Sequence, residues 1–158
     1  MKPADARASV KVAVSQADAF AVFTEEIDRW WRRGPRYRHG RGILAIEKGV
    51  GGRVFESFER DGQTVVVPLG HITVWEPPAR FVYLWRNATF REDQETEVEV
   101  VFAPSGDGTL VTVTHRGWDA IPADHPARHG QDNATFCRGL GLFWGELLSA
   151  LREQIARR

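Results

Sequence analysis

Apolar and polar residues alternate along most of the chain, and this alternation predicts a protein rich in strands. Residues 8–14, ASVKVAV, place every second valine on one face, as a half-buried strand requires. Glycine, proline and Asp-Gly turns then separate further alternating runs at 43–48, 53–60, 64–75, 80–86, 96–103 and 109–116. Pro77–Pro78 forces a corner between two of these strands, because a proline ring fixes φ and removes a backbone donor.

A period of 3.6 residues governs the remaining segments. Ser15 can cap a short helix over SQADAFAVFTE, and EEIDRWW predicts a second short helix directly after it. The segment from roughly 133 to 157 repeats apolar residues at spacings of three and four, which predicts one long amphipathic helix. This order of elements indicates the α+β class, with an antiparallel sheet that buries one face against the last helix.

The period of two in a strand predicts which side chains face that helix. Phe81, Tyr83 and Trp85 share one face of their strand, whereas Trp75 has the opposite parity to Ile72 in the strand before and is expected outside. By the same counting Phe102 and His115 point inward. For 53–60 two alternatives stay open, because either Glu56 faces inward with Val54 and Phe58, or Phe55 does.

The last helix carries three glycines, Gly139, Gly141 and Gly145, and each lowers its helix propensity. One interpretation is a close approach of the helix to the sheet. The other is that the missing side chains leave room for a bound guest.

The composition of the chain argues against several classes of function and partner. The 158 residues suit a single domain, 1–158, and the 21 basic residues balance 21 acidic ones, so no polyanionic partner such as nucleic acid is expected. Cys137 is the only cysteine, which excludes an intramolecular disulfide and a thiolate zinc site. No apolar run is long enough to span a membrane and no secretory signal is visible, so we expect a cytoplasmic protein without membrane insertion. No phosphate loop or dinucleotide fingerprint occurs, so no cofactor is predicted.

Four segments, in order, carry a resemblance to a known family: FTEEIDRWW, IEKGVGGRVFE, GHITVWEPPARFVYLW and VTVTHRGW. The chain resembles proteins related to the activator of the ninety-kilodalton heat-shock protein ATPase, within the START-like (SRPBCC) superfamily. The resemblance covers about residues 8–155 and implies a helix-grip, Bet v-like fold, in which a curved antiparallel sheet wraps around the long helix. It also implies a mostly apolar cavity that holds a small hydrophobic molecule. The co-chaperone activity in the family name is not transferred, because fold alone does not determine function.

On this basis the chain is expected to bind a small hydrophobic or amphipathic molecule. The expected lining, with Trp30 near the mouth, is Trp30, Glu56, Tyr83, Trp85, Phe102, His115, Trp118, Leu140 and Trp144. Two alternatives remain, a cyclase or hydrolase that uses the same cavity and a protein-interaction module that modulates a chaperone. A homodimer is a further expectation.

His115 is the most informative titratable residue. It is either a general base or ligand contact, paired with Glu56 if both face inward, or a core histidine satisfied by its neighbours. His125 and His129 are expected in an exposed loop rather than in a metal site. Residues 29–41 interleave arginines with Trp30 and other aromatic residues, which suits either the closure of a cavity mouth or a solvated loop.

Overall fold

The computed structural model describes residues 5–31, 42–86 and 89–158. Its strands are β1 (Ala6–Val12), β2 (Ile43–Ile46), β3 (Arg53–Arg60), β4 (Gln63–Glu76), β5 (Arg80–Trp85), β6 (Thr96–Ser105) and β7 (Gly108–Arg116). Its helices are α1 (Gln16–Glu25), α2 (Ile27–Trp30) and α3 (Asn133–Ala156), with two 3-10 turns, η1 (Trp118–Ala120) and η2 (Pro126–Arg128). The strands and helices therefore follow the predicted order.

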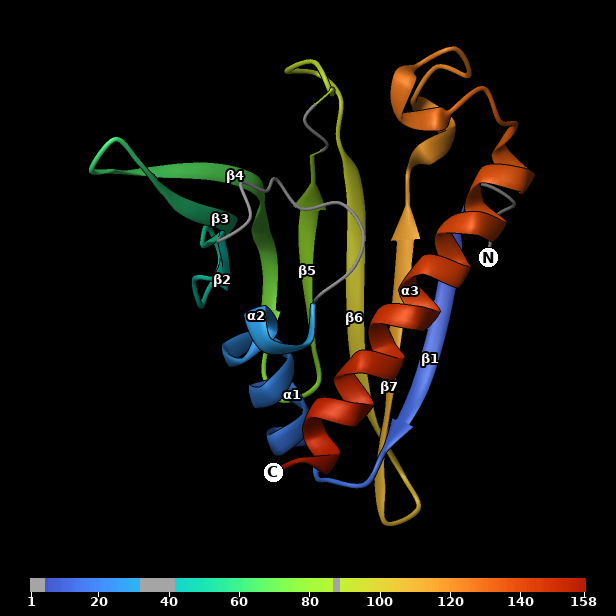
Figure 1. Cartoon of the computed structure of the whole chain (residues 1–158). Coiled ribbons are helices and arrows are strands. Elements are labelled where there is room, and N and C mark those ends of the chain that lie inside the picture. Colours follow the sequence, from blue (N-terminus) through green and yellow to red (C-terminus); the bar gives the residue numbers. More distant parts are fainter. Residues whose placement is uncertain (1–4, 32–41, 87–88) are drawn as a thin grey trace.

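All seven strands form one antiparallel sheet in the order β1-β7-β6-β5-β4-β3-β2. Strands that follow one another from β2 to β7 are neighbours, and β1 closes the order by pairing with β7. Figure 1 shows α3 crossing the face of this curled sheet, with α1 and α2 beside the C-terminal half of α3. The predicted helix-grip arrangement is confirmed.

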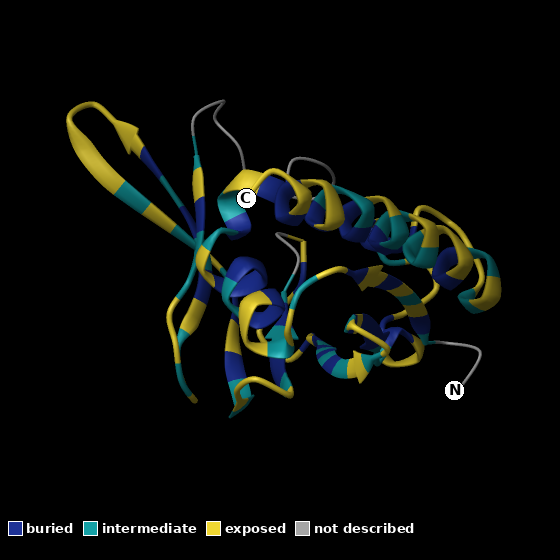
Figure 2. Ribbon diagram, turned by 90° about the horizontal axis from the view of Figure 1, so that it is seen from below, coloured by how far each residue is buried: buried dark blue, intermediate teal, exposed yellow. Residues whose placement is uncertain are grey.

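The long helix begins at a cap and packs through one stripe. The Asp132 side chain accepts a hydrogen bond from the Thr135 backbone N–H at 2.8 Å, which satisfies one of the free donors of the first turn. The inward stripe is buried and includes Phe136, Trp144, Leu147, Leu148, Leu151 and Ile155. In Figure 2 the buried residues of α3 lie on its sheet-facing side, as the apolar spacing predicts.

Strand β4 contains a bulge that the sequence did not reveal. The β4–β5 pairing shifts between Ile72 and Val74, so that Trp75 lies opposite Phe81. The expectation that Trp75 lies outside the sheet is therefore wrong. Its ring packs inward against Phe20, with the ring centroids 5.1 Å apart.

The structure resolves the two alternatives for 53–60 in favour of an inward carboxylate. Val54, Glu56 and Phe58 are all buried, and Glu56 is fully enclosed, whereas Phe55 is only half-buried. Strand β3 thus brings one acidic side chain to the helix-facing side of the sheet.

Two of the three glycines of α3 are not explained by a tight helix–sheet contact. A methyl group added at Gly139 or Gly145 would meet no other atom within 4 Å. At Gly141 it would lie 3.5 Å from the Arg7 carbonyl oxygen, which is an ordinary contact distance. The close-approach interpretation is therefore wrong for Gly139 and Gly145, whereas Gly141 does lie against the backbone of β1 without requiring a glycine.

The arginine-rich loop and the absence of a membrane span were both predicted from sequence. Of the arginine-rich segment 29–41, only residues 29–31 are described, and the rest lies outside the described residues. Across 5–31, 42–86 and 89–158, no helix combines the length and the apolar character needed to cross a membrane.

Candidate ligand-binding site

The space between the helices and the sheet holds two groups of rings. The first, the phenylalanine cluster, consists of Phe20 and Phe23 from α1, Phe81 from β5 and Phe102 from β6. Phe20 lies 5.0 Å from Phe102, and Phe23 lies 5.5 Å from Phe81 in an edge-to-face contact. These separations are typical of a filled aromatic core. The phenylalanine cluster therefore serves as packing between α1 and the sheet.

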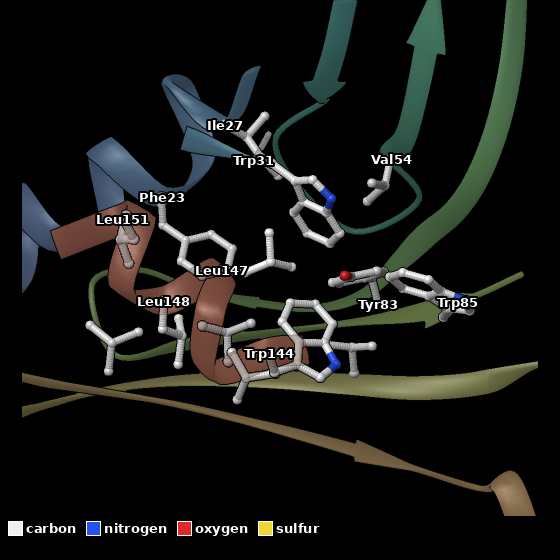
Figure 3. Close-up of a cluster of buried hydrophobic side chains, with 14 of the residues drawn as sticks. Phe23, Ile27, Trp31, Val54, Tyr83, Trp85, Trp144, Leu147, Leu148 and Leu151 are labelled. Atoms are coloured by element: carbon white, nitrogen blue, oxygen red, sulfur yellow. The ribbon is translucent and has the colours of Figure 1, made fainter. Parts of the chain in front are cut away.

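The second group, the tryptophan cluster, consists of Trp31, Trp85, Trp118 and Trp144. Trp31 lies 6.0 Å from Trp85 with nearly parallel planes, and Trp144 stands edge-on to both. Figure 3 shows Trp31 from the end of α2 and Trp144 from α3 pointing toward Tyr83 and Trp85 on β5. Segments distant in sequence thus bring four indoles to one place.

His115 lies at the centre of the tryptophan cluster and is completely buried. Its ring centroid is 5.2 Å from that of Trp85 and 5.5 Å from that of Trp118. The Trp144 indole N–H donates to His115 Nδ1 at 3.2 Å, so the imidazole hydrogen sits on Nε2 and is donated to Thr96 Oγ1 at 2.7 Å. Both ring nitrogens are therefore occupied.

Burial lowers the pKa of His115 to about 3, because the charged imidazolium loses its hydration. The ring is therefore neutral at physiological pH. Protonation at Nδ1 would also require the loss of the Trp144 hydrogen bond. These facts agree with the interpretation of a core histidine satisfied by its neighbours.

The pairing of His115 with Glu56, left open by the sequence, is not formed. Both nitrogens of His115 bond to Thr96 and Trp144. Three strands, β6, β5 and β4, separate β7, which carries the histidine, from β3, which carries Glu56. The carboxylate and the imidazole therefore belong to different halves of the interior.

Tyr83 supplies a further polar group between these halves. It is almost fully buried on β5, and burial raises the pKa of its phenol, so the hydroxyl keeps its proton. Its ring centroid lies 6.4 Å from that of Trp85. The phenol is thus a neutral donor beside the tryptophan cluster.

The structure distributes the nine predicted site residues unevenly. Trp85, His115, Trp118 and Trp144 meet in one cluster, and Tyr83 adjoins it. Phe102 belongs to the phenylalanine cluster, Glu56 lies on β3, and Leu140 is half-buried on α3. Trp30 is buried against Phe23, and its N–H donates to the Phe23 carbonyl at 3.3 Å.

Sequence reasoning missed Trp31, the neighbour of Trp30. A four-residue helix such as α2 has no stripe that would distinguish two adjacent tryptophans. The helix ends at Trp30, and the φ of −81° and ψ of 83° of its C-cap Trp31 leave the helical region and mark a change in chain direction. No local signal could have shown this turn.

The hollows lined by described residues include three on the surface. The largest of these three, about 700 Å³, lies on the outer face of β1, β6 and β7 beside Arg7 and Arg116. Another, about 380 Å³, lies between α1 and Pro77–Pro78, and a third of similar volume lies between Arg29 and α3. None of the three is lined by the tryptophan cluster, and Trp30 is the one predicted site residue among their walls.

No group of three histidine, cysteine, aspartate or glutamate side chains lies in metal-binding reach within 5–31, 42–86 and 89–158. His125 is engaged in its own loop. Its Nδ1 accepts the Ala127 backbone N–H at 3.1 Å, and its Nε2 lies 3.0 Å from Gln94 Oε1. This residue therefore organises η2.

A curled antiparallel sheet around a C-terminal helix, with an aromatic interior, defines a helix-grip protein of the START-like class. Residues 13–151 match the family described as Activator of Hsp90 ATPase homolog 1-like protein. The chain therefore belongs to this family, whose members commonly bind hydrophobic ligands. A search of curated proteins found no match.

Solved structures with the same fold include three informative cases. A protein of Nitrosomonas europaea is 14% identical, with a TM-score of 0.66 and coverage of 99% of this chain and 97% of that one. The Aha1 dimer of Colwellia psychrerythraea is 15% identical, with a TM-score of 0.61 and coverage of 96% and 95%. An anthrahydroquino-γ-pyrone synthase is 32% identical, with a TM-score of 0.56 and coverage of 94% and 95%.

Proposed function

We propose that the chain binds a planar, polycyclic aromatic molecule between α3 and the sheet, against the tryptophan cluster. The observation that carries this proposal is the convergence of four indoles from α2, β5, η1 and α3 around one neutral histidine. Ligand sites in proteins are mostly apolar, with a few placed polar groups. The tryptophan cluster has this composition.

The orientation of the indoles suits a flat guest. The planes of Trp31 and Trp85 differ by 24°, whereas Trp144 makes angles of 81° and 69° with them. These rings contact one another in the folded chain, so a flat guest would replace part of these contacts with its own in the same face and edge geometries. Tyr83 supplies a hydroxyl beside these surfaces.

Partly buried apolar side chains on both α3 and the sheet support the entry of a hydrophobic molecule into the interior. Leu140 and Phe143 on α3 pack against the core without being fully buried, and Leu69 and Ile46 do so from the sheet. Phe143 also contacts Trp144, with the ring centroids 5.7 Å apart. A hydrophobic molecule would thus meet apolar side chains on its way to the tryptophan cluster.

The class of ligand is taken from the synthase, which among these three proteins has the highest sequence identity to the chain. The anthrahydroquino-γ-pyrone synthase shares 32% of its residues with this chain over nearly the whole length of both. The compound in its name is a fused polycyclic one. A fused ring system of that kind matches the flat indole surfaces of this chain.

The similarity to the synthase also favours a second candidate function, a ring-forming enzyme that uses the space between α3 and the sheet. Its acid–base group would be Glu56, the enclosed carboxyl side chain on β3. His115 is excluded from that role because both of its nitrogens are engaged. Loss of product formation in Glu56→Gln, with ligand binding retained, would support this candidate.

Binding can be tested with 1,4-dihydroxyanthraquinone, a flat three-ring probe that quenches tryptophan fluorescence. Trp85→Ala should weaken binding at least tenfold, because it removes a wall of the tryptophan cluster, and Trp144→Ala should do the same. Trp75→Ala is the matched control, since this ring packs on Phe20 and Phe81 instead. Equal affinity of Trp85→Ala and the unsubstituted chain would refute the proposal.

Dimerisation is also proposed, on the evidence of a relative. The structure from Colwellia psychrerythraea with the same fold is described as a dimer. Light scattering across a range of protein concentrations would test whether this chain pairs, and a constant monomeric mass would refute the proposal.

A further inference from the structure

One fully buried arginine lies outside the two aromatic clusters. Arg128 belongs to η2, in the connection between β7 and α3, and is 1% exposed. Its Nη1 donates to the carbonyls of Trp118 and Ile121 at 3.3 and 3.0 Å, and its Nη2 donates to that of Gln131 at 3.0 Å. Its guanidinium lies over the ring of Phe136, 5.4 Å from the centroid.

These hydrogen bonds leave the Nε–H of Arg128 without an acceptor among the described residues. Hydrogen bonds from Thr135 and, to a smaller extent, the charge of Arg128 lower the pKa of Asp132, but no carboxylate of the described chain lies within ion-pair distance of the guanidinium. Asp132 caps α3 instead, where its carboxylate accepts the Thr135 N–H. A buried cation without an anion, or a buried donor without an acceptor, costs free energy.

A second buried donor in the same place is also unsatisfied. The Trp118 indole N–H is enclosed and has no acceptor within the described chain. Its ring lies 4.5 Å from Phe136, the same ring that Arg128 covers. Two donors without acceptors, one of them on a cation, therefore flank one phenyl ring.

This donor pair lies at one end of the tryptophan cluster. Trp118 belongs to the cluster and contacts His115 at 5.5 Å between ring centroids. A continuous row of rings therefore leads from Trp85 through His115 and Trp118 to Phe136 and the guanidinium. A ligand lying on the tryptophan cluster can present a polar substituent to this end.

We infer that the aromatic ligand carries a carboxylate, which Arg128 and the Trp118 N–H bind at the η1 end of the tryptophan cluster. This inference rests on the proposed function, since it requires a ligand on that cluster. A carboxylate supplies the two acceptors that the donors lack, and its charge balances the guanidinium. The chain would thus select acidic polycyclic aromatics over neutral ones.

Two fluorescent probes of the same shape test this selection. Anthracene-9-carboxylate and 9-anthracenemethanol share a three-ring body and differ in charge at physiological pH. The unsubstituted chain should bind the carboxylate at least tenfold more tightly, which corresponds to about 1.4 kcal/mol. Equal affinity for the two probes would overturn the inference and leave the proposed aromatic site standing.

Variants assign the preference to the two donors. Arg128→Met should bring the affinity ratio of the two probes to about one while the affinity for the methanol probe changes less than twofold. Arg138→Met, at an exposed position of α3, is the matched control and should keep the ratio. If Arg128→Met weakens both probes equally, Arg128 only supports the fold and the inference fails.

Trp118→Phe keeps the test decisive if Arg128→Met does not fold. It retains a ring against Phe136 and removes only the N–H, so the preference for the carboxylate should fall about threefold. An unchanged ratio would overturn the part assigned to Trp118. Failure of both probes to bind the unsubstituted chain would refute the proposed function, and the inference with it.

Discussion

The buried His115 makes a quantitative prediction about stability and pH. The folded chain holds the pKa of this ring at about 3, whereas an exposed histidine in the unfolded chain titrates near 6.5. Between these values the unfolded chain binds a proton that the folded chain does not. Falling pH therefore favours unfolding throughout this window, and the contribution is fully present only above about pH 6.5.

The expected magnitude follows from that difference. Well inside the window each pH unit changes the free energy of unfolding by about 1.4 kcal/mol. Allowing for partial protonation near pH 6.5, this one residue should remove about 2 kcal/mol of stability between pH 7 and pH 5. That is a large share of the 5–15 kcal/mol that is typical of folded proteins.

Urea unfolding at a series of pH values isolates this contribution. His115→Gln removes the titrating group and retains an amide that can replace the imidazole in hydrogen bonding. The variant will be less stable at pH 7, but it should lose about 2 kcal/mol less than the unsubstituted chain on going to pH 5. His71→Gln, at an exposed position of β4, should follow the unsubstituted chain. Parallel pH profiles for His115→Gln and the unsubstituted chain would refute the reasoning.

Two further predictions concern packing, and urea unfolding measures both. Gly70→Ala should destabilise the chain by several kcal/mol, because its methyl group would overlap the Leu84 carbonyl oxygen, whereas Gly139→Ala should be neutral or stabilise by up to about 1 kcal/mol. A stable Gly70→Ala would contradict the described β4–β5 contact. Trp144→Phe should cost about 1–3 kcal/mol, because it leaves His115 Nδ1 buried without a donor. Trp75→Phe, which touches no histidine nitrogen, should cost less, and the reverse order would argue against the assigned tautomer.

The fold could be predicted from sequence because its signals are local and periodic. Alternating valines marked β1, and apolar spacings of three and four marked α3. The alternation of side chains along a strand then placed Phe81, Tyr83 and His115 correctly on the inward face. It failed at Trp75, because a bulge adds one residue to a strand without leaving a trace in the hydrophobic pattern.

The candidate site depended on relations that no local pattern encodes. The sequence left the side of Glu56 open, because Phe55 and Phe58 make both registers of β3 plausible. The partners of His115, Thr96 and Trp144, lie on β6 and α3 and meet it only in the folded chain. The ligand-binding assignments, the 1–158 domain and the cytoplasmic location stay predictions.

The two aromatic clusters differ in a way that bears on function. The phenylalanine cluster is built from rings without polar atoms, so nothing in it requires a partner beyond close packing. The tryptophan cluster instead brings N–H groups into the interior, and these groups need acceptors. His115 accepts from Trp144, which satisfies one of them.

At the other end, Trp118 and Arg128 keep donors without acceptors in the described chain. A core selected for stability alone would be better served by phenylalanine at position 118, because burying an unpaired donor is unfavourable. Arg128 does satisfy three backbone carbonyls, but its Nε–H stays without an acceptor in the described chain. The cost is understandable if a bound molecule supplies the missing acceptors. On this argument the polar end of the tryptophan cluster selects the ligand and its apolar walls hold it. Trp118→Phe should therefore raise the stability of the empty chain or leave it unchanged, while it weakens the preference for a carboxylate. Arg128→Met should instead lower the stability, because the carbonyls of Trp118, Ile121 and Gln131 lose their donor.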